Sequence, residues 1–491
     1  KLWLSTEFTY LNYIAQQAGG LSDQMFAEDH FQSNRSRNWF QVNWMLYNLY
    51  VNFKASSTKT ISFNLFGLDA KRDALGFRTN RVSQVDSGDE RDLIKGDFNN
   101  YGFELKYLSR YKIKSKKSNL LLGAKFYKSD NSSRQGPGSS NHDADFNFYT
   151  ADFPNYNNQS MYKYPNLNIA FFGENLFYIN KKLSITPGFR IEHIKTESIG
   201  SYKKINLDAA DNVILNQTIF NNNIRERSFV LLGTGLAYKT KAEIYGNISQ
   251  NYRSVTFADI SIVNPAYSID PEISDEKGHT IDMGVRGELN KYISFDISAF
   301  NLYYNDRIGF IQKAYDDGSV KSEKGNVGNA LIYGFESLID LNLSKVLLLN
   351  ENNIFNFYIN NLFINSEYIE SQRNGVEGNN VEFVPNINIK SGVKFGFNDL
   401  LSNIQFSYLS SQFTDASNAI ESNLSGVIGE IPEYYILDFS SSYSYKKYKF
   451  EFGINNVLNY KYFTRRATGY PGPGIIPSPG MNLYGTLEIK I

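Results

Sequence analysis

Apolar and polar residues alternate with a period of two along much of the chain. The alternation is clearest in residues 183–192, 293–299 and 386–397, where most alternate side chains are aliphatic or aromatic. This is the pattern of a β-strand whose two faces meet different surroundings. The opposite face carries charges such as Arg190 and Asp296, which a dry core would exclude and a hydrated interior would accept. The pattern therefore predicts strands with one apolar face and one wet face.

These segments are joined alternately by short turns and by long polar loops. The short turns are predicted at residues 56–59, 113–117, 180–182, 239–241, 290–292, 343–345, 398–400 and 445–448. The long loops are predicted at residues 16–35, 78–92, 130–159, 197–223, 256–276, 314–324, 367–380, 415–431 and 464–480. Eight turns and nine loops make eighteen strands, with both chain ends on the short-turn side. Such asymmetry is typical of outer-membrane barrels, so the predicted fold is all-β, a transmembrane antiparallel β-barrel.

One strand segment does not follow the simple alternation. In residues 41–53 both sets of alternate positions contain apolar side chains. A β-bulge, or a stretch lying above the membrane, would each account for this pattern. The loop at 464–480 is rich in proline and glycine, and we expect no regular structure there.

Composition excludes several classes of function. Lys plus Arg equals Asp plus Glu at 50 each, so no net field attracts nucleic acid, and none is expected as a partner. The chain has no cysteine, which excludes a disulfide framework and a thiolate metal site. No run of 18 apolar residues occurs, so no transmembrane helix is expected. Neither a nucleophile elbow nor a phosphate-binding loop is present, and we expect neither an enzyme nor a cofactor.

The C-terminal segment resembles a known family. Residues 453–459, 462–466 and 469–474, followed by a last amphipathic strand, are similar to the final hairpin of TonB-dependent outer-membrane receptors. The resemblance is greatest to the branch that takes up ferric dicitrate and siderophores. Further segments resemble this branch in the same order along the chain: 72–77, 134–140, 183–190, 251–260 and 264–278.

The resemblance implies that residues 1–491 are the β-barrel domain of such a receptor, without its N-terminal plug. Family barrels have 22 strands, so a count of eighteen would leave four strands outside this sequence. The energy-coupling segment would also lie outside it. A signal peptide would be removed or lie further upstream. The implied function is uptake of a ferric chelate through a bacterial outer membrane, energised by the TonB complex acting on the plug. A monomer in contact with outer-membrane lipid and lipopolysaccharide is implied too.

Arginines near the predicted outer loops are the candidate binding residues. Ferric chelates are usually anionic, and the guanidinium group pairs with carboxylates through two parallel hydrogen bonds. The predicted substrate-binding set is Arg78, Arg81, Arg134, Gln135, Arg253, Arg465 and Arg466. For each arginine alone, simple solvation or binding of lipopolysaccharide phosphate is the alternative.

Three other functions remain open from the sequence. A passive porin would consist of eighteen strands closed into a pore. The barrel half of a nutrient-docking complex would use some of its outer loops for protein contacts. An outer-membrane enzyme is the weakest alternative, because His193, the best-placed strand histidine, alternates onto the apolar face.

Overall fold

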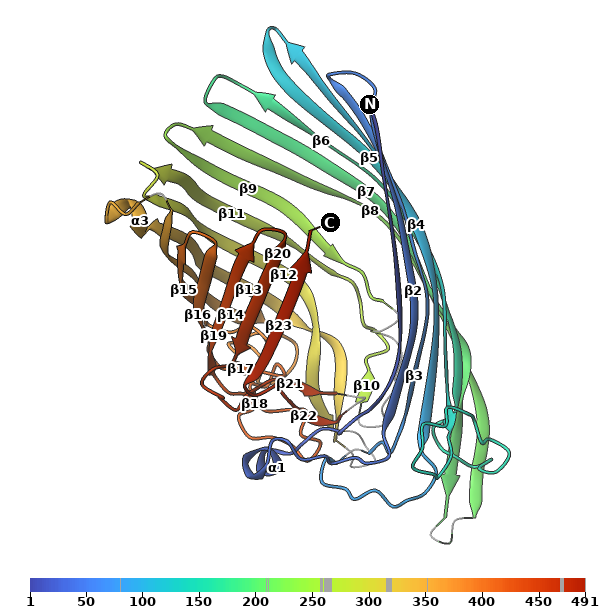
Figure 1. Ribbon diagram of the computed structural model, residues 1–491. Coiled ribbons are helices and arrows are strands. Elements are labelled where there is room, and N and C mark those ends of the chain that lie inside the picture. The colour runs from blue at the N-terminus through green and yellow to red at the C-terminus, as the bar shows by residue number, and fades with distance from the viewer. Residues whose placement is uncertain are drawn as a thin grey trace.

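The structure is a large curved sheet of antiparallel strands with loops packed at one end (Figure 1). The computed structural model describes residues 1–79, 81–208, 210, 212–256, 259, 267–314, 320–350, 352–468 and 472–490, without the side chains of residues 267, 320 and 321. The long strands are β1 (Leu2–Gln16), β2 (Trp39–Lys54), β3 (Lys59–Gly76), β4 (Asp92–Ile113), β5 (Lys116–Pro137), β6 (Ser160–Tyr178), β7 (Leu183–Leu207), β8 (Val213–Lys239), β9 (Ala242–Arg253), β11 (Glu276–Leu289), β12 (Ile293–Ala314), β13 (Val320–Asn342), β14 (Asn353–Glu370), β15 (Ile387–Phe397), β16 (Leu400–Leu409), β19 (Tyr434–Tyr445), β20 (Tyr448–Asn455) and β23 (Asn482–Ile489).

Short elements lie in the connections at the loop end. They are α1 (Asp23–Glu28), β10 (Tyr267–Ile269), β17 (Gln412–Phe413), β18 (Glu430–Ile431), β21 (Phe463–Ala467) and β22 (Gly474–Pro477). A further helix, α3 (Leu343–Val346), lies at the opposite end. None of the helices in the described part of the chain is long and apolar enough to cross a membrane.

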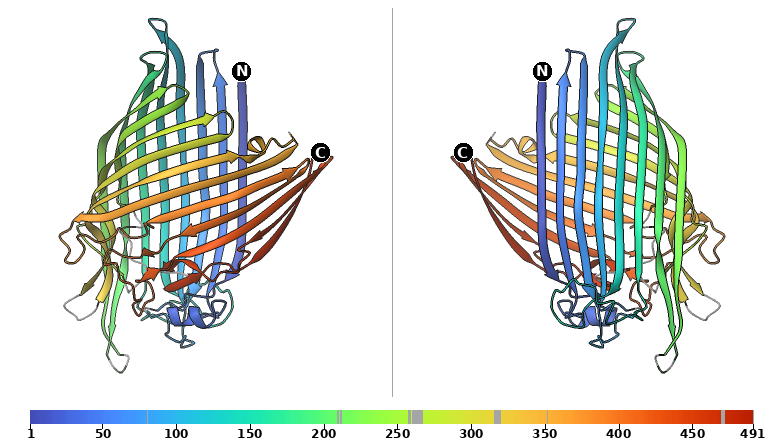
Figure 2. Two further views of the ribbon diagram at one scale, coloured as in Figure 1. Left: turned by 90° about the vertical axis from the view of Figure 1, so that its left-hand side faces the viewer. Right: turned by 90° about the vertical axis from the view of Figure 1, so that its right-hand side faces the viewer.

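Each long strand pairs antiparallel with the next one along the chain. The main sheet contains 19 strands, of which β10 is a three-residue piece that pairs in parallel with β13. Leaving out β10 gives eighteen, the predicted number. Within the described residues no pairing joins β1 to β23, and Figure 2 shows these two edges apart, with both termini at the short-turn end. The sheet is therefore open along one side.

The strand register separates an apolar outer face from a polar inner face. One outer row runs directly across the last strands through Phe357, Val393, Ile404, Phe439, Ile454 and Leu483. The adjacent inner row consists of Asn356, Lys394, Asn403, Ser440, Gly453 and Tyr484. A charge such as Lys394 is tolerated on the inner face because that side of an outer-membrane barrel is hydrated. The predicted two-faced strands are confirmed.

Seven of the predicted tight turns are confirmed. Several contain non-glycine residues with positive φ, such as Asn290 and Lys291. The pair Lys114 and Ser115 forms a two-residue turn, which requires positive φ at both positions. The turn predicted at 343–345 is wrong. There the connection between β13 and β14 runs from 343 to 352 and contains α3, whose first turn is capped by Asn342.

Several of the predicted loops contain regular structure, and in two of them it replaces most of the loop or contradicts the expectation. Most of residues 197–223 belongs to the paired strands β7 and β8. These strand segments were predicted as a loop because they are rich in Asn, Thr and Lys and lack a clear apolar alternation. In residues 464–480 the strands β21 and β22 form a small sheet, so proline and glycine did not prevent pairing. Parts of the loops predicted at 256–276 and 314–324 lie outside the described residues.

We expect a charge on the outer face to destabilise the barrel. Ile404→Arg places a guanidinium in the apolar row of β16, at a cost of about 2–4 kcal/mol if that row meets the middle of the bilayer. The free energy of unfolding in lipid vesicles measures this loss. Gln405→Arg is the matched control, since its neighbour on the inner face is Asp438, and it should cost far less. Equal losses would contradict the assigned faces.

Candidate functional site

The outer loops pack into a small core in which the first and last loops meet. Leu21 and Ile475 exchange two backbone hydrogen bonds of 2.9 and 2.8 Å. Their side chains are buried together with Ile431 and Phe463. Figure 1 shows α1, β18, β21 and β22 gathered at this end of the sheet. The loops of the two ends of the chain therefore form one surface around the mouth.

Arg466 is the polar link of this loop core. Its Nη1 and Nη2 atoms donate to the carboxylate of Asp23 at 2.9 and 2.6 Å, and Nη2 also donates to the carbonyl of Glu430 at 2.9 Å. Burial raises the pKa of Asp23, but the hydrogen bonds and charge of Arg466 outweigh it and hold this pKa below the ordinary value. The arginine is itself buried. Arg466 therefore joins α1 to the last loop and offers little to a ligand.

Asp92, on the inner side of the sheet, binds two of the predicted residues, Arg78 and Gln135. It accepts hydrogen bonds from Arg78 Nη1 at 2.6 Å, from Gln135 Nε2 at 2.8 Å and from the Tyr156 hydroxyl at 3.1 Å. Burial raises the pKa of Asp92, and the charge of Arg78 only partly offsets this. Burial and the neighbouring Asp92 likewise raise the pKa of Tyr156. Three separate segments are therefore tied to one carboxylate.

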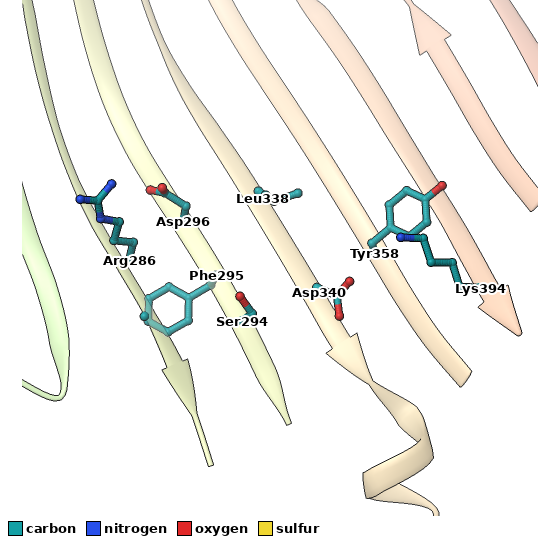
Figure 3. Close-up of a pocket in the computed structure, with 9 residues that line it drawn as sticks. Arg286, Ser294, Phe295, Asp296, Leu338, Asp340, Tyr358 and Lys394 are labelled. Carbon is teal, nitrogen blue, oxygen red and sulfur yellow. The ribbon is translucent and has the colours of Figure 1, made fainter. Parts of the chain in front are cut away.

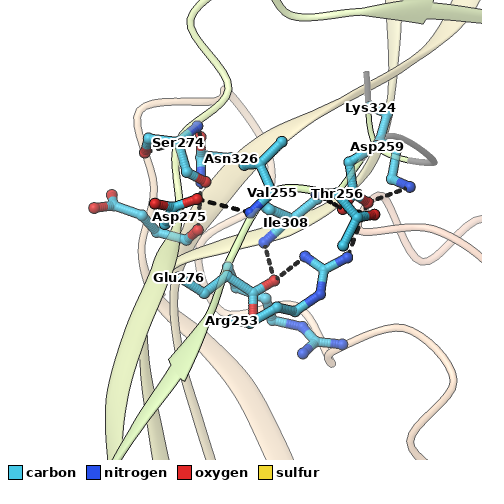
Figure 4. Close-up of polar contacts among 12 residues, drawn as sticks. Arg253, Val255, Thr256, Asp259, Ser274, Asp275, Glu276, Ile308, Lys324 and Asn326 are labelled. Carbon is cyan, nitrogen blue, oxygen red and sulfur yellow. Dashed lines mark hydrogen bonds and ion pairs between the residues drawn. The ribbon is translucent and has the colours of Figure 1, made fainter. Parts of the chain in front are cut away.

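Arg253 lies in a second network, shown in Figure 4. Its Nη1 and Nη2 atoms donate to Glu276 Oε1 and Asp259 Oδ1, both at 2.9 Å. Lys324 Nζ lies 2.6 Å from the same Asp259 oxygen, and the Ile308 N–H donates to Glu276 at 2.7 Å. Burial raises the pKa of Asp259, but its hydrogen bond with Lys324 and those from Thr256 hold it below the ordinary value. The two cations are balanced by two carboxylates.

The remaining predicted arginines are exposed and differ in position. Arg134 stacks on the Phe148 ring, with 4.3 Å between Cζ and the ring centroid. The uninterrupted register of β5 places Arg134 on the same face as Phe126, in the outer row. The side chains of Arg81 and Arg465 form no hydrogen bond or ion pair with any residue that the structure describes. Both are thus available to an external anion.

A hollow of about 550 Å³ with both apolar and charged residues in its lining lies on the wall formed by β11 to β15, near the short-turn end (Figure 3). Its charged lining comes from Arg286, Asp296, Asp340 and Lys394. Arg286 pairs with Glu243 at 2.5 Å, and the Tyr245 hydroxyl donates to Asp296 at 2.7 Å. This wall carries both signs of charge. In the described part of the chain, no three His, Cys, Asp or Glu residues come close enough together to hold a metal ion.

The model of a known protein family decides the classification. Residues 3–457 match the family described as TonB dependent receptor-like, beta-barrel. The chain belongs to the TonB-dependent receptors. It is therefore a β-barrel of the Gram-negative outer membrane, from a family of transport receptors and not of enzymes. No curated protein sequence matches the chain significantly.

Solved structures share the fold of this TonB-dependent receptor barrel. The ferric citrate transporter FecA superposes with a TM-score of 0.76 at 18% identity, over 99% of this chain and 67% of FecA. The ferric yersiniabactin uptake receptor FyuA from Yersinia pestis gives 0.74 at 13% identity, over 99% and 68%. The copper transporter OprC gives 0.68 at 14% identity, over 93% and 67%. The chain thus spans about two thirds of each of these proteins.

Other arginines at the mouth of the receptor were not predicted from the sequence. Arg91 is fully buried and donates to the carbonyls of Ser139, Arg37 and Asp143 at 2.9, 3.0 and 2.8 Å. Arg227 pairs with Asp275 at 2.9 Å. Nothing in the local sequence marks these residues, because their partners come from distant segments. Their contacts hold loop backbones in place.

Removing the carboxylate of Asp92 should loosen three outer segments together. Asp92→Ala leaves the buried Arg78 guanidinium without its ion pair, and breaking a buried pair costs about 3–5 kcal/mol. We expect faster hydrogen exchange in residues 78–92 and 137–156. Asp89→Asn, at an exposed carboxylate of the same loop, is the control and should leave exchange unchanged. Unaltered exchange in the Asp92 variant would contradict the assigned role.

The Arg253 network should be lost in acid. The pKa of Asp259 is lower in the folded protein than in the unfolded chain, so its contribution to stability is complete above about pH 4. It disappears as the pH falls through the lower, folded value. Proteolysis of the 254–275 loop should therefore accelerate below about pH 4. The Asp259→Asn variant should not show this acceleration in acid. The control variant Asp306→Asn, at an exposed neighbouring carboxylate, should still show the acceleration in acid.

Proposed function

We propose that this chain is the barrel of a receptor that takes up an anionic ferric chelate, such as ferric dicitrate or a siderophore complex, through the outer membrane. The single observation that carries the proposal is the pair of exposed, unpartnered arginines, Arg81 and Arg465, beside the loop core at the mouth. FecA, a ferric citrate transporter, and FyuA, a ferric yersiniabactin uptake receptor, share the fold and support it. OprC, a copper transporter of the same fold, is the competing precedent for the cargo.

Both arginines are attached to the same packed loops. Arg81 precedes Val82, whose N–H donates to the Leu424 carbonyl at 3.3 Å. Arg465 precedes Arg466, which donates to the carbonyl of Gly426 at 3.4 Å. The two guanidinium groups thus project from segments that meet on the 424–426 loop. A pair of guanidinium groups suits a chelate with several carboxylate oxygens.

The other predicted residues are assigned to positioning the mouth or to the outer face, and not to binding the cargo. Arg78 and Gln135 position the mouth through Asp92, Arg253 does so through Asp259 and Glu276, and Arg466 through Asp23. Arg134 on the outer face lies beside Lys95 of the neighbouring strand. A cation pair above the apolar belt suits a lipopolysaccharide phosphate better than a cargo in the lumen.

Energised transport requires a closed barrel. The free edges of β1 and β23 would leave backbone N–H and C=O groups unpaired in hydrocarbon, at a cost of several kcal/mol each. We propose that further strands close this gap, as in the 22-stranded transporters whose lumen holds a plug. Residues 1–491 would then form a single barrel domain, monomeric, and coupled to the TonB complex through that plug. An eighteen-stranded porin would need β1 to pair with β23, and the described residues make no such pair.

Chelate binding tests the site in the intact receptor purified from outer membranes. Arg81→Ala and Arg465→Ala should each weaken the binding of ferric dicitrate about tenfold or more, since each removes charge-assisted hydrogen bonds. Isothermal titration gives the dissociation constant. Arg134→Ala is the matched control and should bind as the parent does. A loss confined to the Arg134 variant, or none in the other two, would contradict the proposed site.

A further inference from the structure

The hairpin of β7 and β8 extends beyond the neighbouring strands at the loop end. β8 pairs with β7 over nearly its whole length, from Val213 to Tyr238. Its pairing with β9 covers only residues 233–239, whereas β9 stays paired with β11 as far as Arg253. Figure 2 shows this hairpin projecting past the rest of the sheet. Among the described residues, therefore, β8 has a strand partner on one edge only at residues 213–232.

The direction of one hydrogen bond identifies the groups on the free edge. The Leu232 N–H donates to the Gln250 side chain of β9 at 2.9 Å, so it points away from β7. Backbone direction alternates along a strand, and the pairing with β7 has no register shift in this stretch. The same edge therefore carries the N–H and C=O groups of Asn216, Thr218, Phe220, Asn222, Ile224, Glu226, Ser228 and Val230. No described residue hydrogen bonds to these backbone groups.

This edge lacks the features that normally prevent strand addition. Proteins protect free edges with lysines, prolines, bulges or a covering segment. Residues 216–224 read Asn-Gln-Thr-Ile-Phe-Asn-Asn-Asn-Ile and contain neither a charge nor a proline. Phe220 and Ile224 on its outer side are 78% and 61% exposed. This part of the edge, residues 216–224, is therefore uncharged and partly apolar, whereas charges begin at residue 225.

We propose that the free edge of β8 at residues 216–224 is a docking site for an extended segment of a partner polypeptide outside the cell, which adds a strand to the sheet. Regularly alternating N–H and C=O groups are matched along their whole length by another extended backbone. A second copy of this chain fits less well. Two copies in one membrane have the same orientation, so their β8 strands would run in parallel, which is the weaker pairing. The inference does not depend on the cargo.

The side chains beside the edge define the partner further. An antiparallel segment would place apolar side chains next to Phe220 and Ile224, four residues apart on one face. On its other face it would meet the amides of Asn221 and Asn223. The segment is thus a strand with aliphatic or aromatic residues at the positions that meet Phe220 and Ile224.

A peptide copying residues 195–207 provides the probe, because this sequence already aligns antiparallel with β8 along its other edge. Labelled peptide is titrated into the intact receptor in single-copy nanodiscs, and fluorescence polarisation measures binding. We expect saturable binding, weakened roughly tenfold in Asn222→Pro relative to Asn222→Ala. Both variants remove the side-chain contact from the Gly200 N–H, but only proline removes the edge N–H. Proline is tolerated where that N–H faces solvent.

Two N-methylated peptides make the test independent of any protein variant. Methyl groups on alternate residues block one edge of the peptide, so one alternate set should abolish binding and the other should preserve it. The proposal would be overturned if neither the proline nor the methyl groups changed the affinity of the peptide, or if no saturable binding were seen. A receptor dimer that Asn222→Pro dissociates, without peptide binding, would assign the edge to a second copy and also overturn it.

Discussion

The structure depends on one constraint, the need of every backbone N–H and C=O group in hydrocarbon for a partner within the protein. The long strands meet it by pairing in sequence order, which makes each hairpin the neighbour of the next. The period-two alternation then sorts apolar side chains outward and polar ones inward. In the described residues this pairing is interrupted at the edges of β1 and β23 and along β8 beyond Gly233, and both proposals above start from these edges.

At the mouth the loops are held together by ion pairs between loop arginines and carboxylates from distant segments. Asp92, Asp259 and Asp23 each hold an arginine that the sequence alone offered as a ligand for cargo. An arginine already held by a carboxylate must lose that bond before it can bind another anion. Among the predicted arginines, the charges of Arg81, Arg134 and Arg465 have no carboxylate partner among the described residues, and Arg134 lies on the outer face. Arg81 and Arg465 are left as the candidates for cargo.

The sequence predicted the strand order, both faces and seven turns because alternation and turn chemistry are local. Residues 41–53 contain no bulge, because Trp44 and Leu46 lie on the inner face without any register shift in β2; part of the lumen wall is apolar. The extension of the β7–β8 hairpin through residues 197–223 was predicted as a loop, because polar residues interrupt the apolar alternation there. The partners of Arg78 and Arg253 depend on contacts between loops, which no local pattern encodes.

The contacts between the first and last loops also bear on how the barrel assembles. Asp23 and Arg466 are 443 positions apart in the chain, and the Leu21–Ile475 bridge is similarly remote. Contacts of such high order form slowly, because the entropy of closing the intervening chain must first be lost. The rim can therefore close only after the final hairpin has been delivered. An assembly intermediate that lacks this hairpin would expose the Leu21 surface, which makes the first loop a natural reporter of completed folding.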